Sequence, residues 1–357
     1  MIRVNHVEVI PVPFRLAEGY RIAGHQYASA ENIVVKVDTS DGRTGFGNAA
    51  PAPEVTGETS AAALHALRDQ LLALLRASDA GDPAGFARRA LETAPRAPAA
   101  RAACEMALLD LVGLRARAPL ARVLGMKRER LPTSITLGID EPQATLERAR
   151  RHVAAGFRIL KLKVGENWED DLVMVRRLRQ ELGTGVLIRA DANQGYSEGS
   201  ARRFLAALPA GDLELLEQPT PASDLQAMRR LADAFDLPIM ADESVQDAPG
   251  ARRLVEARAA DLVNVKLMKS GGVTEAMEIA LTTSAAGIGA MIGCMDESRI
   301  SMAAALHYGL AAPMVERADL DGHLDLIDDV ATGGVRIADG FVLPFLDRDG
   351  LGIKVNL

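Results

Sequence analysis

The sequence has few cysteines, no excess of basic residues and no long apolar run, and each absence removes a class of function. Cys104 and Cys294 are the two cysteines among 357 residues, too few for a disulfide framework or a thiolate metal site. The net charge of −7 argues against nucleic acid as a partner, because phosphate binding requires a clustered basic surface. The start of the chain lacks a signal-peptide pattern, and no stretch of about 18 apolar residues follows. We therefore expect a cytoplasmic protein that contacts neither membrane nor nucleic acid.

The pattern of the chain changes twice, which predicts its domains. Strand-like runs, NHVEVIPVPF and NIVVKVDT, occupy residues 1–50 with a turn at 40–43. Residues 58–125 are rich in Ala, Leu and Arg, and Cys104, Ala107, Leu108 and Leu111 recur at helical spacing. We predict an α+β capping domain over residues 1–125, on which a β-rich tail at 322–357 packs back.

Residues 126–321 alternate short β-rich runs with amphipathic helices at intervals of about 25 residues. The eight strand candidates are TSITLGI, RILKLKV, VLIRADAN, LELLEQP, PIMADES, DLVNVKLMK, GAMIGCM and PMVERADLD. This grammar predicts an α/β fold, a (β/α)8 TIM-like barrel that forms the catalytic domain. A doubly wound sheet is the alternative, but no GxGxxG follows the first strand.

Charged side chains end the inward-facing set of five successive strands. Because strand side chains alternate, Lys163, Asp191, Glu217, Asp242 and Lys266 should all point into the barrel. They are spaced 24 to 28 residues apart, so each lies near the carboxyl end of its strand. Barrel enzymes build their active sites at that end.

The three carboxylates of this ring would repel one another, and burying an unpaired charge costs several kcal/mol. One carboxylate alone would more often cap a helix or lie in a loop. Three with matched spacing indicate a bound cation. Because the set holds only oxygen ligands, we predict Mg²⁺ rather than a soft metal or a Ca²⁺ cage.

The lysines suggest proton transfer. Lys163 and Lys266 would flank anything bound to the metal, and mutual repulsion beside a divalent ion should lower their pKa values. A chelated carboxylate substrate could lose its α-proton to form an enediolate, which Lys161 would stabilise. Two bases on opposite faces permit epimerisation, whereas a lone strand-end lysine would be only a surface cation.

With these residues in place, the sequence resembles the enolase superfamily, within it the muconate lactonizing enzyme subgroup. The match is carried by KLK at 161–163, DAN at 191–193, EQP at 217–219, ADES at 241–244 and KLMKSGG at 266–272. The resemblance covers essentially the whole chain. It implies that Asp191, Glu217 and Asp242 hold Mg²⁺ and that Lys163 and Lys266 are the paired acid/base catalysts.

Further stretches are similar to the dipeptide epimerases of that subgroup, most closely the L-Ala-D/L-Glu type. These are VTGET at 55–59, DLD at 319–321 and GCMDES at 293–298. The resemblance implies that Asp319 and Asp321 hold a substrate ammonium, as paired carboxylates can, although they could instead belong to a solvated acidic loop. It further implies substrate contacts from Thr136, Cys294 and Met295, a mobile capping loop at 15–24 whose Arg21 could pair with an acidic side chain, and homo-oligomeric assembly. It leaves Asp296 without a role.

We therefore predict a Mg²⁺-dependent dipeptide epimerase acting at the α-carbon of the C-terminal residue, with L-Ala-L-Glu as one possible substrate. The same scaffold leaves open an N-acylamino acid racemase, an o-succinylbenzoate synthase or a cycloisomerase. A Schiff-base lyase would use a lysine but leave the carboxylates without purpose. A peptide-binding module would not need two opposed bases.

Overall fold

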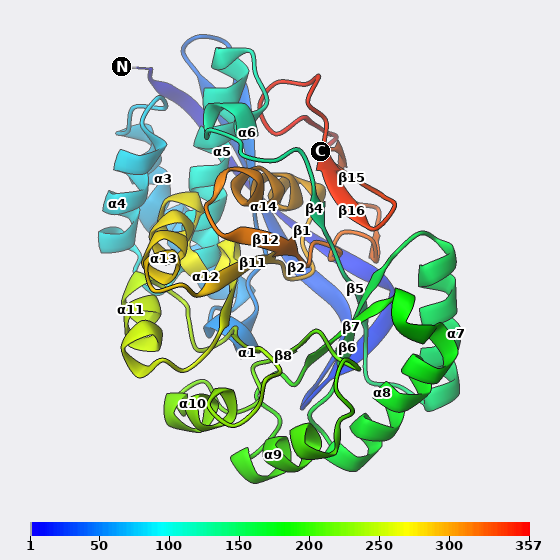
Figure 1. Cartoon of the computed structure of the whole chain (residues 1–357). Coiled ribbons are helices and arrows are strands. Elements are labelled where there is room, and N and C mark those ends of the chain that lie inside the picture. The colour runs from blue at the N-terminus through cyan, green and yellow to red at the C-terminus, as the bar shows by residue number, and fades with distance from the viewer. Residues whose placement is uncertain (1) are drawn as a thin grey trace.

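The computed structural model describes residues 2–357, and its centre is a parallel sheet of eight strands (Figure 1). The strands lie side by side in chain order from β5 to β12. They are β5 (Ile135–Leu137), β6 (Ile159–Lys163), β7 (Leu187–Asp191), β8 (Leu215–Glu217), β9 (Ile239–Ala241), β10 (Leu262–Lys266), β11 (Gly289–Gly293) and β12 (Val315–Ala318). An isolated parallel bridge between Thr133 and Ala318 joins the two edges. The eight predicted strands and the barrel are thus confirmed.

Helices connect successive strands on the outside of the barrel. They are α7 (Pro142–Ala154), α8 (Trp168–Leu182), α9 (Glu198–Ala207), α10 (Leu225–Ala232), α11 (Ala248–Ala257), α12 (Leu267–Ser270), α13 (Val273–Ala285) and α14 (Arg299–Ala311). The starts of α8, α9, α10, α11 and α14 are set by local chemistry. An Asn, Ser or Asp side chain accepts a backbone N–H of the first turn in each, satisfying a donor that the helix leaves free.

The barrel interior follows the predicted alternation. Inward-facing Leu215, Met240, Leu262 and Met291 form a separate buried apolar cluster. Two residues further along three of these strand segments stand Glu217, Asp242 and Asn264. The interior therefore changes from apolar to charged towards the carboxyl ends of the strands, which positions the site.

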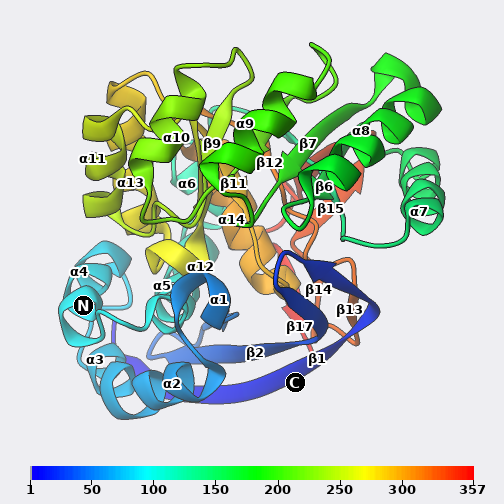
Figure 2. The same ribbon diagram turned by 90° about the horizontal axis from the view of Figure 1, so that it is seen from below.

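An antiparallel sheet of the order β13-β1-β2-β3 lies against the barrel (Figure 2). Its strands are β1 (Val4–Ile22), β2 (His25–Thr39), β3 (Thr44–Ala49) and β13 (Leu326–Ile327). The accompanying helices are α1 (Pro53–Thr56), α2 (Ser60–His65), the π-helical turn η1 (Ala66–Leu71), α3 (Leu72–Arg76), α4 (Pro83–Thr93), α5 (Pro98–Ala116) and α6 (Leu120–Val123). Helix α5 is buried nearly throughout, including its charged Arg101, Glu105 and Asp110.

The segment 15–24 is not the loop that we predicted. Most of it is the outer part of strand β1, paired with β2 up to Ile22 opposite His25. The reason is a tight connection at Ala23 and Gly24, where Gly24 adopts a φ of 79° that favours glycine. This hairpin also buries Leu16 and Ile22, which the polar look of the segment concealed.

The tail returns to the N-terminal sheet, as predicted. Strand β13 pairs with β1, and Leu351 donates its N–H to Asp110 of α5 at 2.8 Å. The remaining pairings join β15 (Val335–Ala338) to β16 (Phe341–Pro344), β16 to β4 (Leu131–Pro132), and β14 (Ala331–Gly333) to β17 (Ile353–Val355). The exact domain limits at residues 125 and 321 remain a prediction. Over residues 2–357, none of the helices combines the length and apolarity that a membrane span requires.

Candidate active site

The predicted ring lies together at the carboxyl ends of the barrel strands. Lys163, Asp191 and Glu217 are register partners on β6, β7 and β8. Asp242 follows β9 directly, and Lys266 ends β10. Alternation from Lys163 puts Lys161 on the same inner face of β6.

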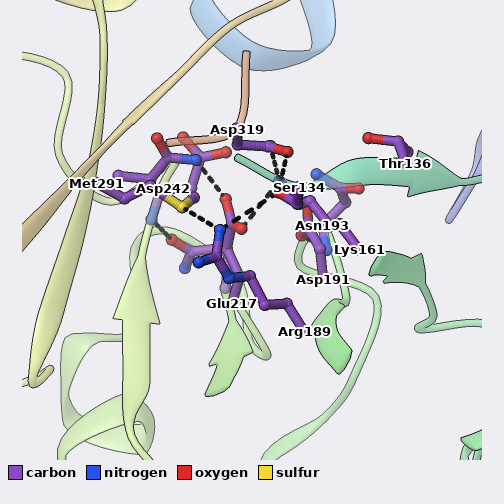
Figure 3. A network of polar contacts seen from close by, with 12 residues as sticks. Ser134, Thr136, Lys161, Arg189, Asp191, Asn193, Glu217, Asp242, Met291 and Asp319 are labelled. Carbon is purple, nitrogen blue, oxygen red and sulfur yellow. Dashed lines mark hydrogen bonds and ion pairs between the residues drawn. The ribbon is translucent and has the colours of Figure 1, made fainter. Parts of the chain in front are cut away.

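Lys161 occupies the centre of the ring. Its Nζ lies 3.0 Å from Asp191 Oδ2, 2.9 Å from Glu217 Oε2 and 2.8 Å from Asp319 Oδ2. Figure 3 shows Lys161, Asp191, Glu217 and Asp319 converging, with Ser134 beside them. A single ammonium is thus shared by three acidic side chains from three different strand ends.

The other two lysines stand on separate parts of the ring. Lys163 Nζ donates to Asp191 Oδ2 at 2.7 Å and to Asn193 Oδ1 at 2.9 Å. Lys266 Nζ lies 2.7 Å from Asp242 Oδ2. Each proposed base is therefore paired with a proposed metal ligand, one on β7 and the other after β9.

The three carboxylates have the chemistry of a site for a hard cation. Asp191, Glu217 and Asp242 are wholly buried. Within residues 2–357, Glu217 Oε2 and Asp242 Oδ2 accept no hydrogen bond of good geometry, although lysine nitrogens are near. Among the same residues, no three acidic, His or Cys side chains are already arranged as a metal cage. The donor set fits Mg²⁺ by type and burial.

Buried carboxylates raise the pKa values of two of the lysines. Burial lowers the pKa of Lys161, but attraction to Asp191, Asp319 and Glu217 outweighs it and raises this pKa well above its usual value. Burial and then Asp242 act likewise on Lys266, whose pKa is also raised. The predicted lowering is for Lys163 and Lys266 beside a bound divalent ion, and it stays a prediction, because the raised pKa of Lys266 reflects the protein groups alone. Lowering requires a divalent ion to share these carboxylates.

The aspartates at 319 and 321 follow β12 and are both buried. Asp319 accepts hydrogen bonds from Lys161 Nζ at 2.8 Å and Ser134 Oγ at 2.6 Å. Asp321 Oδ2 accepts the backbone N–H of Thr136 at 2.7 Å, and burial beside Asp319 raises the pKa of Asp321 to about 7.

These groups open into a cavity of about 520 Å³ between the barrel and the β1–β2 hairpin. Of the predicted residues, those that line it are Lys161, Lys163, Lys266, Asp319, Asp321, Thr136, Cys294 and Met295. Each of the three proposed metal ligands has a carboxylate oxygen within 3.0 Å of the Nζ of one of these lysines. Arg21 lies outside the cavity, half-exposed with Nη2 3.6 Å from Glu166 Oε2, because Tyr20 and Ile22 take the cavity side of the strand. Its predicted contact with substrate is not supported by this position.

Two features in and around the site escaped the sequence reasoning. Lys269, one helical turn after Lys266, is buried and donates to Asp242 Oδ1 and Asp242 O, both at 2.6 Å. It lies beyond the strand end, where the alternation argument stops. The hairpin also supplies Tyr20, which donates to Asp296 Oδ2 at 3.0 Å.

The ends of β7 and β8 have unusual backbone geometry. Asn193, Gln194 and Gln218 have φ values of 40°, 69° and 33°. Such conformations are uncommon outside glycine and concentrate at functional sites. The hydrogen bonds of the Gln218 side chain account for its backbone conformation. Its Oε1 accepts the N–H of Asp242 at 2.9 Å and its Nε2 donates to Ser244 Oγ at 2.8 Å, which links β8 to the segment after β9.

Comparison with protein families agrees with this geometry. A family described as "Enolase C-terminal domain-like" matches residues 144–357, and "Mandelate racemase / muconate lactonizing enzyme, N-terminal domain" matches residues 4–125. The chain belongs to the enolase superfamily, in its mandelate racemase and muconate lactonizing enzyme group.

Its similar relatives are epimerases and racemases, which are isomerases. An L-Lys-D/L-Arg epimerase of Methylococcus capsulatus is 41% identical over 98% of this chain and 99% of its own length. The dipeptide epimerase structure from that organism, complexed with Mg and L-Arg-D-Lys, has a TM-score of 0.94 at 41% identity, covering 98% of this chain and 99% of that one.

Two other relatives act on different substrates. The substrate-liganded L-Ala-D/L-Glu epimerase of Bacillus subtilis has a TM-score of 0.92 at 32% identity, covering 98% of both chains. The N-succinyl Arg/Lys racemase of Bacillus cereus has a TM-score of 0.95 at 28% identity, covering 99% of this chain and 96% of that one. Substrate therefore varies among relatives that share the fold.

Proposed function

We propose that this protein is a Mg²⁺-dependent dipeptide epimerase that inverts the α-carbon of the C-terminal residue. The observation that carries the proposal is the convergence of Lys163 and Lys266, from β6 and β10, on one cavity that also holds Asp319 and Asp321. Two bases reached from different strands suit removal of a proton on one side and its return on the other.

Asp191, Glu217 and Asp242 would hold the metal ion. Bound Mg²⁺ would supply Lewis-acid stabilisation to the substrate carboxylate as negative charge develops. Lys161, already the counter-charge at the ring centre, would stabilise the same charge through its ammonium. Lys163 and Lys266 would each take or give the α-proton at Nζ. Closure under the hairpin would exclude water and strengthen these interactions.

Asp319 and Asp321 would bind the α-ammonium of the dipeptide. Their carboxylates are separated by one residue, buried, and line the cavity that the lysines enter. A primary ammonium is recognised by charge-assisted hydrogen bonds to such a pair. Asp319 is shared with Lys161, so the less neutralised Asp321 would carry most of this recognition.

We further propose a preference for cationic side chains over the L-Ala-L-Glu substrate suggested by the sequence. Asp296 and Glu54 line the cavity, and their side-chain partners are the hydroxyls of Tyr20 and Tyr27 rather than cations. Burial raises the pKa of Asp296 to about 6, which still leaves it mostly ionised at pH 7. L-Ala-L-Glu loses its proposed partner, because Arg21 lies outside the cavity. The name of the Methylococcus relative points the same way.

A dipeptide library tests both levels of the proposal. We expect L,L-dipeptides incubated with enzyme and Mg²⁺ in deuterated water to gain one deuterium and form the diastereomer, fastest with Lys or Arg side chains. Chelation of the metal should stop the reaction, and added Mg²⁺ should restore it. Exchange with no dipeptide would refute the epimerase, whereas faster reaction of L-Ala-L-Glu would refute only the cationic preference.

An N-acylamino acid racemase is the second candidate, and the Bacillus cereus relative favours it. Such substrates carry an acyl group in place of the free ammonium. Racemisation of N-succinyl-lysine faster than epimerisation of any dipeptide would support this function. A requirement for Asp321 with dipeptides but not with N-succinyl amino acids would identify the role of the aspartate pair. The substrates of an o-succinylbenzoate synthase or a cycloisomerase carry no free ammonium for Asp319 and Asp321, so the buried aspartate pair favours the dipeptide reaction over both.

A further inference from the structure

The turn that follows Lys266 is pressed against the N-terminal domain. It consists of α12 (Leu267–Ser270) and the glycines 271 and 272, which have φ values of 84° and 130°. A β-carbon at Gly271 would lie 2.3 Å from Arg101 Nη2, and one at Gly272 would lie 1.8 Å from Glu105 Oε2. Both glycines are therefore required by the close approach of α5, as well as by their backbone conformations.

Arg101 contacts this turn from α5, and Glu105 of the same helix binds the first residues of α13, which follow the turn directly. Glu105 Oε1 accepts the backbone N–H of Thr274 at 3.0 Å and also the Thr274 hydroxyl. Arg101 Nη2 approaches the Ser270 carbonyl oxygen at 3.5 Å, while Nη1 donates to Ala94 O at 2.8 Å. Both side chains are more than nine-tenths buried. Buried charged groups used in this way hold their partners in a defined geometry.

The VTGET motif at 55–59 supports the same contact. Its Glu58 is buried and accepts the backbone N–H of Ala99 at 2.7 Å, at the start of α5. The Glu58 carboxylate also offsets the buried charge of Arg101 electrostatically. Two stretches far apart in sequence, VTGET and the glycines after Lys266, thus meet on one buried arginine.

We propose that Arg101 and Glu105 are positioning residues that fix Lys266 through this turn, so that the N-terminal domain sets the geometry of one of the two bases. The inference rests on the proposed function, since it needs Lys266 to act on the α-proton. Lys163 ends a different strand, β6, and is not part of this turn. Loss of the contacts from Arg101 and Glu105 should therefore impair one face of the reaction and spare the other.

The test measures initial rates of α-proton exchange in deuterated water, separately from the L,L and L,D diastereomers. Lys266→Ala identifies the diastereomer from which Lys266 removes the proton. Glu105→Ala should slow exchange from that diastereomer about ten- to a hundredfold, because displacements near 1 Å cost that much. Exchange from the other diastereomer should stay within about twofold. Glu105→Gln should restore the rate, since its amide oxygen can accept the N–H of Thr274.

Asp110→Ala is the matched control. Asp110 is buried on the same helix, but it accepts the N–H groups of Phe46 and Leu351 and does not contact the turn. It should lower stability without favouring either face. If Glu105→Ala does not fold, Arg101→Lys provides the same test with charge retained. Equal slowing of both faces, or of neither, overturns the positioning role. If Lys266→Ala itself leaves both faces intact, the proposed two-base function fails first.

Discussion

The two ends of the barrel interior are made by the same strands but hold opposite kinds of side chain. At the lower end Leu215, Met240, Leu262 and Met291 form a buried apolar cluster, with the Arg189 guanidinium at its edge. At the rim, lysines and carboxylates are almost as deeply buried. Burying each apolar side chain contributes about 1.5–3 kcal/mol, whereas each buried ion costs several kcal/mol before pairing. The comparison teaches that one end stabilises the fold and the other uses that stability for chemistry.

Arg189 places one buried charge at the level of the apolar cluster, because it is the register partner of Leu215. It is 1% exposed on β7, two residues before Asp191, and donates to Glu214 Oε2 at 2.8 Å and Ala318 O at 2.9 Å. The nitrogen that donates to Ala318 O, Nη1, also reaches Ser134 Oγ and Met291 Sδ. The Arg189 guanidinium thus contacts both Ser134 and Met291 inside the barrel, next to the ring of charged residues.

The largest effect should come from removing either proposed base at the rim. Lys163→Ala or Lys266→Ala should lower the rate of epimerisation by at least about 10²- to 10⁴-fold, the range for loss of a general acid or base. One-sided deuterium exchange should survive in each. Chiral chromatography and mass spectrometry measure the two processes separately. Normal epimerisation by both variants would contradict the assignment.

The lower end should respond in stability instead. Met240→Ala should reduce the free energy of unfolding by about 2–5 kcal/mol, because it leaves a cavity in a dry cluster. Urea unfolding measures this change, and kcat for the folded variant should stay close to that of the parent. Met314→Ala, at a side chain 39% exposed, is the control and should change stability by less than about 0.5 kcal/mol. A large loss of kcat in Met240→Ala would contradict the separation of stability and catalysis between the two ends of the barrel.

A smaller effect is expected at the substrate ammonium site. Asp321→Asn should reduce kcat/KM for dipeptides roughly 10- to 150-fold, because it weakens a charge-assisted hydrogen bond. This corresponds to a loss of about 1.5–3 kcal/mol of transition-state stabilisation. Asp325→Asn, another carboxylate of the cavity lining, controls for general loss of negative charge. Similar losses in the two variants would argue against a specific ammonium site.

The smallest effect should appear at the proposed site for the substrate side chain. Asp296→Asn should lower the preference for Lys and Arg dipeptides over Ala dipeptides by about 1 kcal/mol, roughly fivefold, with a smaller change at high salt. Tyr20→Phe removes the hydrogen bond to Asp296 but keeps its charge, and should preserve the preference. Competition assays with paired substrates measure the ratio. An unchanged ratio in Asp296→Asn would mean that this carboxylate does not read the side chain.

Much of the fold and of the ring of charged residues could be predicted, because the alternation of side chains along a strand and the spacing between strands can be read directly from the sequence. Lys163, Asp191 and Glu217 needed only parity to be placed together. The position of Arg21 differs from the expectation because strand β1 continues beyond residue 15, so that the Arg21 side chain points away from the cavity. The polar composition of the segment conceals this strand. Lys269 was missed because its position depends on one helical turn after β10. The contacts of Tyr20 and Glu105 join residues 276 and 169 positions apart in the sequence, which no local pattern encodes.

The side-chain amide of Gln218 has a consequence for how this scaffold can change. It ties the residue after Glu217 to the backbone of Asp242, so neighbouring acids cannot shift independently. A substitution at one of them disturbs the rest, and their effects should be strongly non-additive. We therefore expect these acidic positions to change little during evolution. Substrate selectivity should change instead through the hairpin and the segment after β11, where one side chain can be replaced without disturbing the carboxylates.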